Sequence, residues 1–399
     1  MSEVTAPLAQ KRSLMPSLKR SAREYGLLAS LLVIVVFFQI ATGGALLQPL
    51  NLTNLLLQNS YIVVMALGML MVIVCGHIDL SVGSIVGVIG AIAAVLMVQM
   101  KLDFITTSII CILAGGVIGA AQGYWVAFWR MPSFIVTLAG MLVFRGATIA
   151  ISGGQSIGPF PANFTAISSG FIPELFEGTG LKLTSLMVGI LVAGAFWVVE
   201  LRSRKRLARN GGQVGSKGLF LLKNGILTAL IIFFCYQLAT YRGLPTVLII
   251  MSVLIAVYTF IMNRTVLGRW IYAVGGNLKA AKLSGIDTAK VTFFTFVNMG
   301  ILAAIAGLIF TSRLNSATPR AGLGFELDVI AAVFIGGASA SGGVGKVVGV
   351  VIGAFIMGVL NNGMSILGIG VDYQQMIKGA VLLAAVFVDV YQKNKGNPA

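Results

Sequence analysis

The fold is decided by residues 57–100, LQNSYIVVMALGMLMVIVCGHIDLSVGSIVGVIGAIAAVLMVQM, where two apolar runs flank the four residues GHID. The runs cover 57–75 and 80–100, and each is close to the roughly 20 residues that an α-helix needs to cross a bilayer. This pattern predicts two membrane-spanning helices joined by a tight turn.

The turn itself holds His77, the only histidine in the chain, and Asp79. These two residues form either a reactive site or a plain connection between two spans. Asp79 stands directly before Leu80, where a carboxylate typically caps the first turn of the next helix. We therefore expect Asp79 to act as an N-cap, in a turn near the cytoplasmic face.

Similar apolar runs continue along the chain. Hydrophobic residues make up 57% of the sequence and charged residues only 10%, against about 25% charged in ordinary soluble domains. The sequence thus predicts an all-α, polytopic transmembrane bundle of about 10–12 spans. Segment 327–341 is short, and either a thin span or a re-entrant piece would fit it. The runs are 27–46, 57–75, 80–100, 106–129, 134–152, 184–200, 222–240, 245–263, 292–312, 345–367 and 374–390.

Positive charge is concentrated between these runs. Residues 1–26, 201–223 and 264–290 hold 17 of the 28 Lys and Arg residues, which is typical of cytoplasmic loops. This distribution argues against nucleic acid as a partner. An even number of spans, with both termini cytoplasmic, places all three stretches inside. The expected organisation is a basic N-tail (1–26), a transmembrane domain (27–391) with a cytoplasmic loop at 264–291, and a C-tail (392–399).

Motifs for chemistry are missing from the sequence. The stretch ASASGGVGKVVG (338–349) departs from a phosphate-binding loop, since Ala340 replaces its first glycine and Val347 its Ser or Thr. The loops are too short for a folded ATPase or ligand-binding domain. The three cysteines lie in apolar segments, with no metal or disulfide spacing. We expect no enzyme activity and no cofactor in this chain.

A few polar side chains fall inside the predicted spans. Arg145 either snorkels to the interface or faces a polar pathway. Glu326 and Asp328 begin the short segment, where solvation near a membrane face and a helix N-terminus would suit them. Uncharged polar residues bind sugar hydroxyls or hydrogen-bond other helices. These residues are Gln122, Asn298, Asn361 and Asn362.

The loop at 264–290 has a recognisable local pattern. Gly275 and Gly276 interrupt the chain, Asn277 is placed to cap a short helix LKAAKLS, and Gly285 is placed to end it. Lys279 and Lys282 are expected to face water, leaving a shallow face of small residues. On spacing alone this is either a docking surface for a partner or a solvated connector.

Several stretches together resemble the permease subunits of bacterial ATP-binding-cassette importers for monosaccharides, closest to the xylose, multiple-monosaccharide and ribose-type permeases. Residues IDLSVGS with GGNLKAAKLSGI are the specific pair, and the resemblance covers almost the whole chain. The other matching stretches are PSFIVTLAGMLVFRG (132–146), ELDVIAAVFIGGASASGGVGKVVG (326–349) and GAFIMGVLNNGMSILG (353–368).

The resemblance implies a permease that moves a monosaccharide, with D-xylose expected, across the bacterial inner membrane. It implies a second permease copy, a cytoplasmic ATPase and a periplasmic sugar-binding protein as partners. The ATPase would dock on Gly276, Asn277, Ala280, Ala281, Ser284 and Gly285. The family commonly has a small or acidic residue where His77 stands, so a proton-relay role for His77 is disfavoured. Candidate pathway residues are Arg145, Gln122, Asn298 and Asn361.

Two other classes of protein remain open. An ion-coupled secondary sugar transporter would need no ATPase, but such carriers usually place ionisable groups near the bilayer midplane, and few are evident here. A membrane scaffold without a transport role is the third reading.

Overall fold

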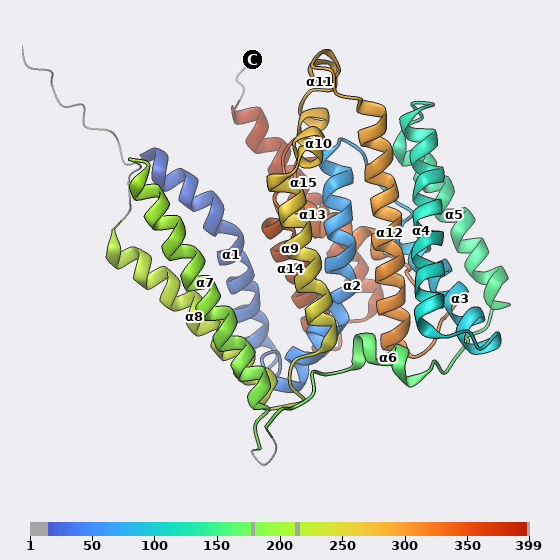
Figure 1. Ribbon diagram of the computed structural model, residues 1–399, viewed down its shortest axis with the longest axis horizontal. Coiled ribbons are helices and arrows are strands. Elements are labelled where there is room, and N and C mark those ends of the chain that lie inside the picture. Colours follow the sequence, from blue (N-terminus) through green and yellow to red (C-terminus); the bar gives the residue numbers. More distant parts are fainter. Residues whose placement is uncertain (1–14, 177–179, 212–215, 397–399) are drawn as a thin grey trace, which may run out of the picture.

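The computed structural model describes residues 15–176, 180–211 and 216–396, and these ranges are almost entirely helical (Figure 1). The all-α prediction is confirmed. The helices are α1 (Met15–Ala41), α2 (Pro49–Val74), α3 (Val82–Ala94), the π-helical turn η1 (Val95–Gln99), α4 (Phe104–Ala127), α5 (Ser133–Ser152), α6 (Ala162–Ser169), α7 (Leu183–Arg209), α8 (Lys217–Ala239), α9 (Thr246–Arg264), α10 (Val266–Gly276), α11 (Leu278–Leu283), α12 (Thr288–Leu314), α13 (Phe325–Ile335), α14 (Val347–Ile366) and α15 (Val371–Gly396).

Ten helices within these ranges are long and apolar enough to span a membrane, and α1 adds a shorter apolar stretch at Gly26–Ala41. The predicted number of spans is confirmed. Some boundaries differ from the prediction. Helix α2 begins at Pro49, eight residues before the predicted run, because proline at the first helical position extends the helix into a more polar sequence. Helix α1 begins within the predicted N-tail and α15 runs to Gly396 within the predicted C-tail, while residues 1–14 and 397–399 lie outside the described residues.

The core is built around α2 and α12, which pack against each other; α12 also packs on α3 and α4. Glycines permit the closest contacts. A Cβ atom on Gly300 would lie 2.1 Å from the carbonyl oxygen of Gly115, and one on Gly119 would lie 2.3 Å from that of Phe296. Small residues let helix backbones approach this closely in lipid. Gly115, Gly119 and Gly123 stand four residues apart on α4 and form the face that packs against α12.

Two crossings are broken, with a non-helical part followed by a helix. Residues 75–81 continue from α2 without helix before α3 begins, and residues 315–324 precede α13. The second break starts beside the α6 end, where the Ala317 N–H donates to the Ile157 carbonyl at 2.9 Å. The crossing that contains this break continues through α13 and finishes at the opposite end, where the Gly343 N–H donates to the Val74 carbonyl at 2.8 Å. Segment 327–341 is therefore the second half of a complete crossing rather than a re-entrant piece.

With this broken crossing and the apolar stretch of α1 counted beside the ten long helices, the described residues make an even number of crossings. Figure 1 shows the start of α1, the short helix α11 and the C-terminal end of α15 at one end of the molecule, with α6 at the other. Both described ends of the chain therefore share a side with the loop helix, as predicted. That this side is cytoplasmic stays a prediction from the positive loops.

Candidate functional site

A group of polar residues meets inside the bundle, between α2, α13, α14 and α15. Asp328 on α13 is buried, and its Oδ2 atom accepts hydrogen bonds from Lys378 Nζ at 3.0 Å and Asn361 Nδ2 at 3.2 Å. We call Gln58, Asn59, Tyr61, Asp328, Asn361 and Lys378 the polar cluster. A buried ion pair costs desolvation free energy for both charges, so its presence within the spans points to a functional role.

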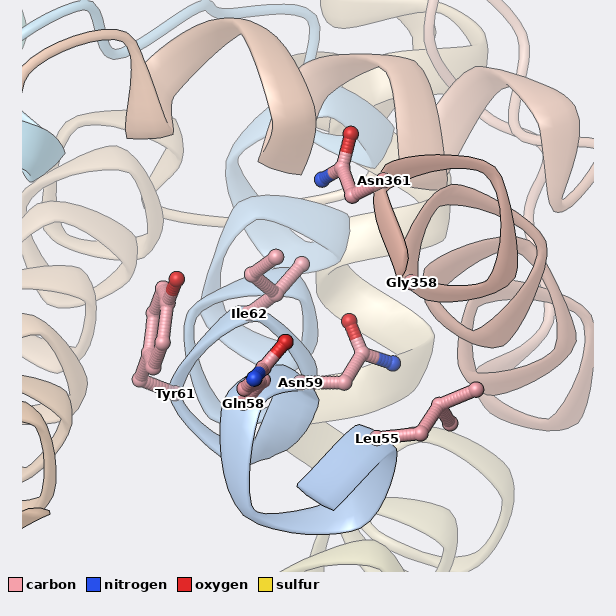
Figure 2. Close-up of a pocket in the computed structure, with 7 residues that line it drawn as sticks. All are labelled: Leu55, Gln58, Asn59, Tyr61, Ile62, Gly358 and Asn361. Atoms are coloured by element: carbon pink, nitrogen blue, oxygen red, sulfur yellow. The ribbon is translucent and has the colours of Figure 1, made fainter. Parts of the chain in front are cut away.

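The polar cluster borders a small cavity between α2 and α14 with a volume of about 60 Å³. Figure 2 shows Gln58, Asn59 and Tyr61 on α2 at one side and Asn361 on α14 at another. Leu55, Ile62 and Gly358 complete the lining. The cavity therefore combines amide and phenol groups with apolar walls.

Several buried acceptors in the polar cluster have no hydrogen-bond partner in the part of the chain that the structure describes. Asn59 donates from Nδ2 to the Ala354 carbonyl at 2.9 Å, but its Oδ1 atom is buried and unpartnered. The same holds for Oδ1 of Asn361 and Oδ1 of Asp328. Buried acceptors are normally satisfied, so these three oxygens point to water or a ligand that donates hydrogen bonds.

Arg145 and Glu326 form a second polar contact region at the start of α13. One carboxylate oxygen of Glu326 lies next to Gly83 on α3, and Arg145 on α5 is near enough to interact with Glu326 electrostatically. One nitrogen of Arg145 and one oxygen of Glu326 are buried without a hydrogen bond. The interpretation of Glu326 and Asp328 as solvated residues near a membrane face was wrong for Asp328, because the helix begins after a break within the crossing.

The other two predicted pathway residues lie away from the polar cluster. The side chain of Gln122 on α4 pairs with the Ser81 hydroxyl: the geometry allows Gln122 Nε2 to donate to Ser81 Oγ at 2.9 Å and Gln122 Oε1 to accept from it at 3.1 Å. Asn298 on α12 accepts a hydrogen bond from Tyr258 on α9 and contacts the sulfur of Met71 on α2. Both side chains connect segments of the bundle. Their role in a pathway stays a prediction.

The turn after α2 corrects one expectation. The N-cap of α3 is Ser81, and Asp79 stands two residues earlier. Its carboxylate accepts from the Ser81 N–H at 2.8 Å and the Ser81 hydroxyl at 2.6 Å, so it stabilises the extended approach to α3 rather than the helix itself. His77 lies 3.4 Å from the Thr292 hydroxyl, at the start of α12. These contacts are those of a packed turn.

The loop helix α11 forms as predicted. Asn277 is its N-cap and accepts from the Ala280 N–H at 3.0 Å, and Gly285 follows its last turn with a φ of +82°. Asp287 then caps α12, and the hydrogen bond from the Lys290 N–H lowers the pKa of that carboxyl, which keeps it ionised. The predicted local structure of the loop is therefore confirmed.

The exposed face of α11 differs from the predicted one in one residue. Gly276, Asn277, Ala280, Ser284 and Gly285 are exposed, but Ala281 is buried, with 4% of its surface accessible. A short helix must turn one side toward the body, and Ala281 occupies it. The residue that the sequence argument missed is Leu283, which is 90% exposed.

Backbone contacts tie this loop to both broken crossings. A Cβ atom on Gly275 would lie 1.6 Å from the Val74 carbonyl oxygen, at the end of α2. The Tyr272 hydroxyl donates to the Gly345 carbonyl at 2.6 Å, in the turn that joins α13 to α14. In that same turn, the Gly343 N–H donates a hydrogen bond to the Val74 carbonyl. A displacement of α11 would therefore reach α2 and α13 through close backbone contacts.

An all-α bundle with two broken crossings, an intramembrane polar cluster and an exposed loop helix defines a multi-pass membrane transport subunit. The chain belongs to the permease family described as "Branched-chain amino acid transport system / permease component", whose model matches residues 51–386.

Named relatives point to sugars rather than amino acids. The chain is 40% identical to the xylose transport system permease protein XylH of Haemophilus influenzae, over 93% of this chain and 97% of the relative. It is 40% identical to XylH of Escherichia coli K12, over 92% of both chains. It is 35% identical to the ribose import permease protein RbsC of the same strain, over 85% of both. No solved structure matches the chain.

Proposed function

We propose that this chain is the membrane-spanning subunit of an ATP-driven importer that carries D-xylose across the bacterial inner membrane. The observation that carries the proposal is the 40% identity to xylose permeases over nearly the full length of both chains. In this proposal ATP hydrolysis belongs to a separate cytoplasmic subunit, and a periplasmic binding protein delivers the sugar.

Uptake by the reconstituted assembly tests this substrate. The chain, with the ATPase and binding protein that copurify from its own membranes, is placed in liposomes loaded with ATP. We expect labelled D-xylose to accumulate only when ATP is inside. Unlabelled ribose, galactose, arabinose and leucine serve as competitors. Preferential competition by leucine would show that the transported substrate is a branched-chain amino acid rather than a sugar.

The ATPase docks, in this proposal, on the exposed residues of α11. That helix is fixed at both ends by caps and carries Leu283 on its tip, and α10, directly before it, contacts both broken crossings through Gly275 and Tyr272. A rigid, exposed apolar side chain on a short helix is suited to a pocket on a partner protein. Movement of the bound ATPase would then rock α2 and α13.

Leu283→Asp should abolish copurification of the ATPase, with loss of at least about 2 kcal/mol of binding free energy, as for a central interface residue. The fold should be unaffected, because the side chain is 90% exposed. The measurement is the amount of ATPase bound to affinity-purified permease. Leu175→Asp is the matched control, since Leu175 is 74% exposed in the loop near α6 at the other end of the molecule. Normal ATPase binding by the Leu283 variant would reject α11 as the docking site.

A second copy of the chain completes the pathway in this proposal. Helix α5 packs on α3, α15 packs on α13, and α3 contacts α13. Arg145 on α5 and Lys378 on α15 are both partly exposed within long apolar helices. Charged groups are costly against lipid, so a protein surface or a polar pathway suits these two side chains better. Copurification of two differently tagged copies in mild detergent would support the pair, and recovery of one tag alone would count against it.

One observation favours an ion-coupled secondary transporter as an alternative. The Asp328–Lys378 pair is an ionisable site within the spans, and such sites are typical of carriers driven by ion gradients. Sugar uptake by the purified chain alone, collapsed by an ionophore, would establish this alternative. Uptake that requires ATP and survives the ionophore would exclude it.

A further inference from the structure

We propose that the cavity lined by Asn59, Tyr61 and Asn361 is a subsite that binds hydroxyl groups of the transported monosaccharide. This inference rests on the proposed sugar-permease function and assigns particular side chains to it. The sugar hydroxyls donate hydrogen bonds to the unpartnered amide oxygens of Asn59 and Asn361.

The first argument is the chemistry of the orphan atoms. The three side-chain atoms of the polar cluster that are buried without a partner among the described residues are all oxygen acceptors, Oδ1 of Asn59, Asp328 and Asn361. Asn59 is 1% exposed and Asp328 is 5% exposed, so bulk water does not satisfy them. Leaving a buried acceptor unsatisfied costs about 1–3 kcal/mol. A ligand with several adjacent hydroxyl donors would recover that free energy.

The second argument is charge. The Asp328 carboxylate is already paired with Lys378 at 3.0 Å, so the two charges of this pair cancel. Asn361 bonds to the same carboxylate oxygen, which fixes its amide plane and turns Nδ2 toward the ion pair, away from a ligand. The remaining lining is amide, phenol and aliphatic. This surface fits an uncharged polyol better than an ion or a zwitterionic amino acid.

The third argument is position. Asn361 lies five residues before the end of α14, about 7 Å from that end, and this end is opposite to α11. A sugar delivered from the side opposite the ATPase would meet the polar cluster early in its crossing. The apolar side chains Leu55 and Ile62 provide the wall against which sugar C–H groups can pack.

The cavity is contracted in this structure. Its volume of about 60 Å³ holds roughly two water molecules, which is less than a monosaccharide needs. Gly358 brings α14 so close to α2 that a Cβ atom there would lie 2.5 Å from the Asn59 side chain. Binding of the sugar therefore requires separation of α2 and α14, and reclosure would expel it.

The test compares Asn361→Ala with Asn362→Ala. The neighbouring Asn362 provides a matched control, because its amide exchanges hydrogen bonds of 2.8 and 3.0 Å with Asn51 and leaves none of its side-chain atoms among the unpartnered ones. Uptake is measured in liposomes with the complete assembly, using D-xylose and its 2-, 3- and 4-deoxy analogues as probes. Each rate is divided by the wild-type rate for the same sugar, which cancels the preference of the binding protein.

For Asn361→Ala we expect about tenfold slower D-xylose uptake, as for one lost hydrogen bond of about 1.4 kcal/mol. One deoxy analogue should show no loss, because it already lacks the hydroxyl that Asn361 binds. ATPase copurification should stay normal. For Asn362→Ala, all four sugars should change in the same ratio, together with a lower melting temperature.

Equal losses for all four sugars in Asn361→Ala, or no loss, would overturn the subsite while leaving the permease function intact. A wild-type assembly that transports none of the four sugars would overturn the proposed function, and the subsite with it. The two failures are therefore distinguishable in the same experiment.

Discussion

Gly322→Ala should strongly destabilise the fold of the permease. A Cβ atom on Gly322 would lie 1.8 Å from the carbonyl oxygen of Gly83, and the backbone φ there is +78°. The positive φ costs an alanine about 1–2 kcal/mol, and overpacking typically costs about 1–3 kcal/mol more. The obstacle is backbone rather than a flexible side chain, so we expect a loss at the upper end of that range. The measurement is the melting temperature and the yield of monodisperse protein in detergent.

Gly324→Ala is the matched control for this prediction. Gly324 has nearly the same φ, +79°, but no atom lies within 4 Å of an added Cβ. The Gly324→Ala variant should lose only the cost of placing alanine at a positive φ, about 1–2 kcal/mol. Equal melting temperatures for the two variants would show that the close approach of Gly83 and Gly322 contributes nothing measurable.

The contact that Gly322 makes is central to the fold because the two broken crossings meet there. Gly83 opens α3 and Gly322 lies just before α13, so the first residues of both helices are held against each other. Neither segment can shift along the membrane normal without the other. Through Val74 and Gly343, the same two segments are joined to the loop that carries α11.

Local signals were enough to predict much of this architecture. The long spans follow from runs of about 20 apolar residues, and α11 follows from Asn277 and Gly285, whose conformational preferences act within a few residues of the chain. The packing role of Gly115 and Gly119 follows from four-residue spacing, which places both on one helix face. In each case the deciding interaction is short in sequence, so the sequence alone reveals it.

The polar cluster could not be predicted in this way. Asn59, Asp328 and Asn361 come from three segments that are far apart in sequence, and no spacing rule connects them. Asp328 was expected near a membrane face because it opens a short apolar segment, and the non-helical residues 315–324 have the composition of an ordinary loop, which does not show that they run into the bundle. Ala281 was expected at the surface because a six-residue helix does not reveal which side faces the body. Both outcomes depend on tertiary contacts.

The second large effect is expected at the ion pair. Lys378→Met should lower the free energy of unfolding by about 3–5 kcal/mol, because it leaves the Asp328 carboxylate buried without its cation. Asp328→Asn should cost less, since the Lys378 side chain is 22% exposed, against 7% for Asp328, and its long chain can redirect the ammonium group toward water. Melting temperatures in detergent, at one pH and one salt concentration, provide the comparison.

The double variant Asp328→Asn, Lys378→Met separates stability from function. With both charges removed, no unpaired ion remains, so the melting temperature should recover most of the loss seen in Lys378→Met. Asn361 would then face an amide in place of a carboxylate, and its orientation would no longer be fixed by a charged acceptor. We therefore expect the double variant to fold and bind the ATPase while its sugar uptake stays well below wild type. A double variant as unstable as Lys378→Met would show that the carboxylate is not what destabilises the single variant. One that transports normally would show that the ion pair serves the fold rather than the pathway.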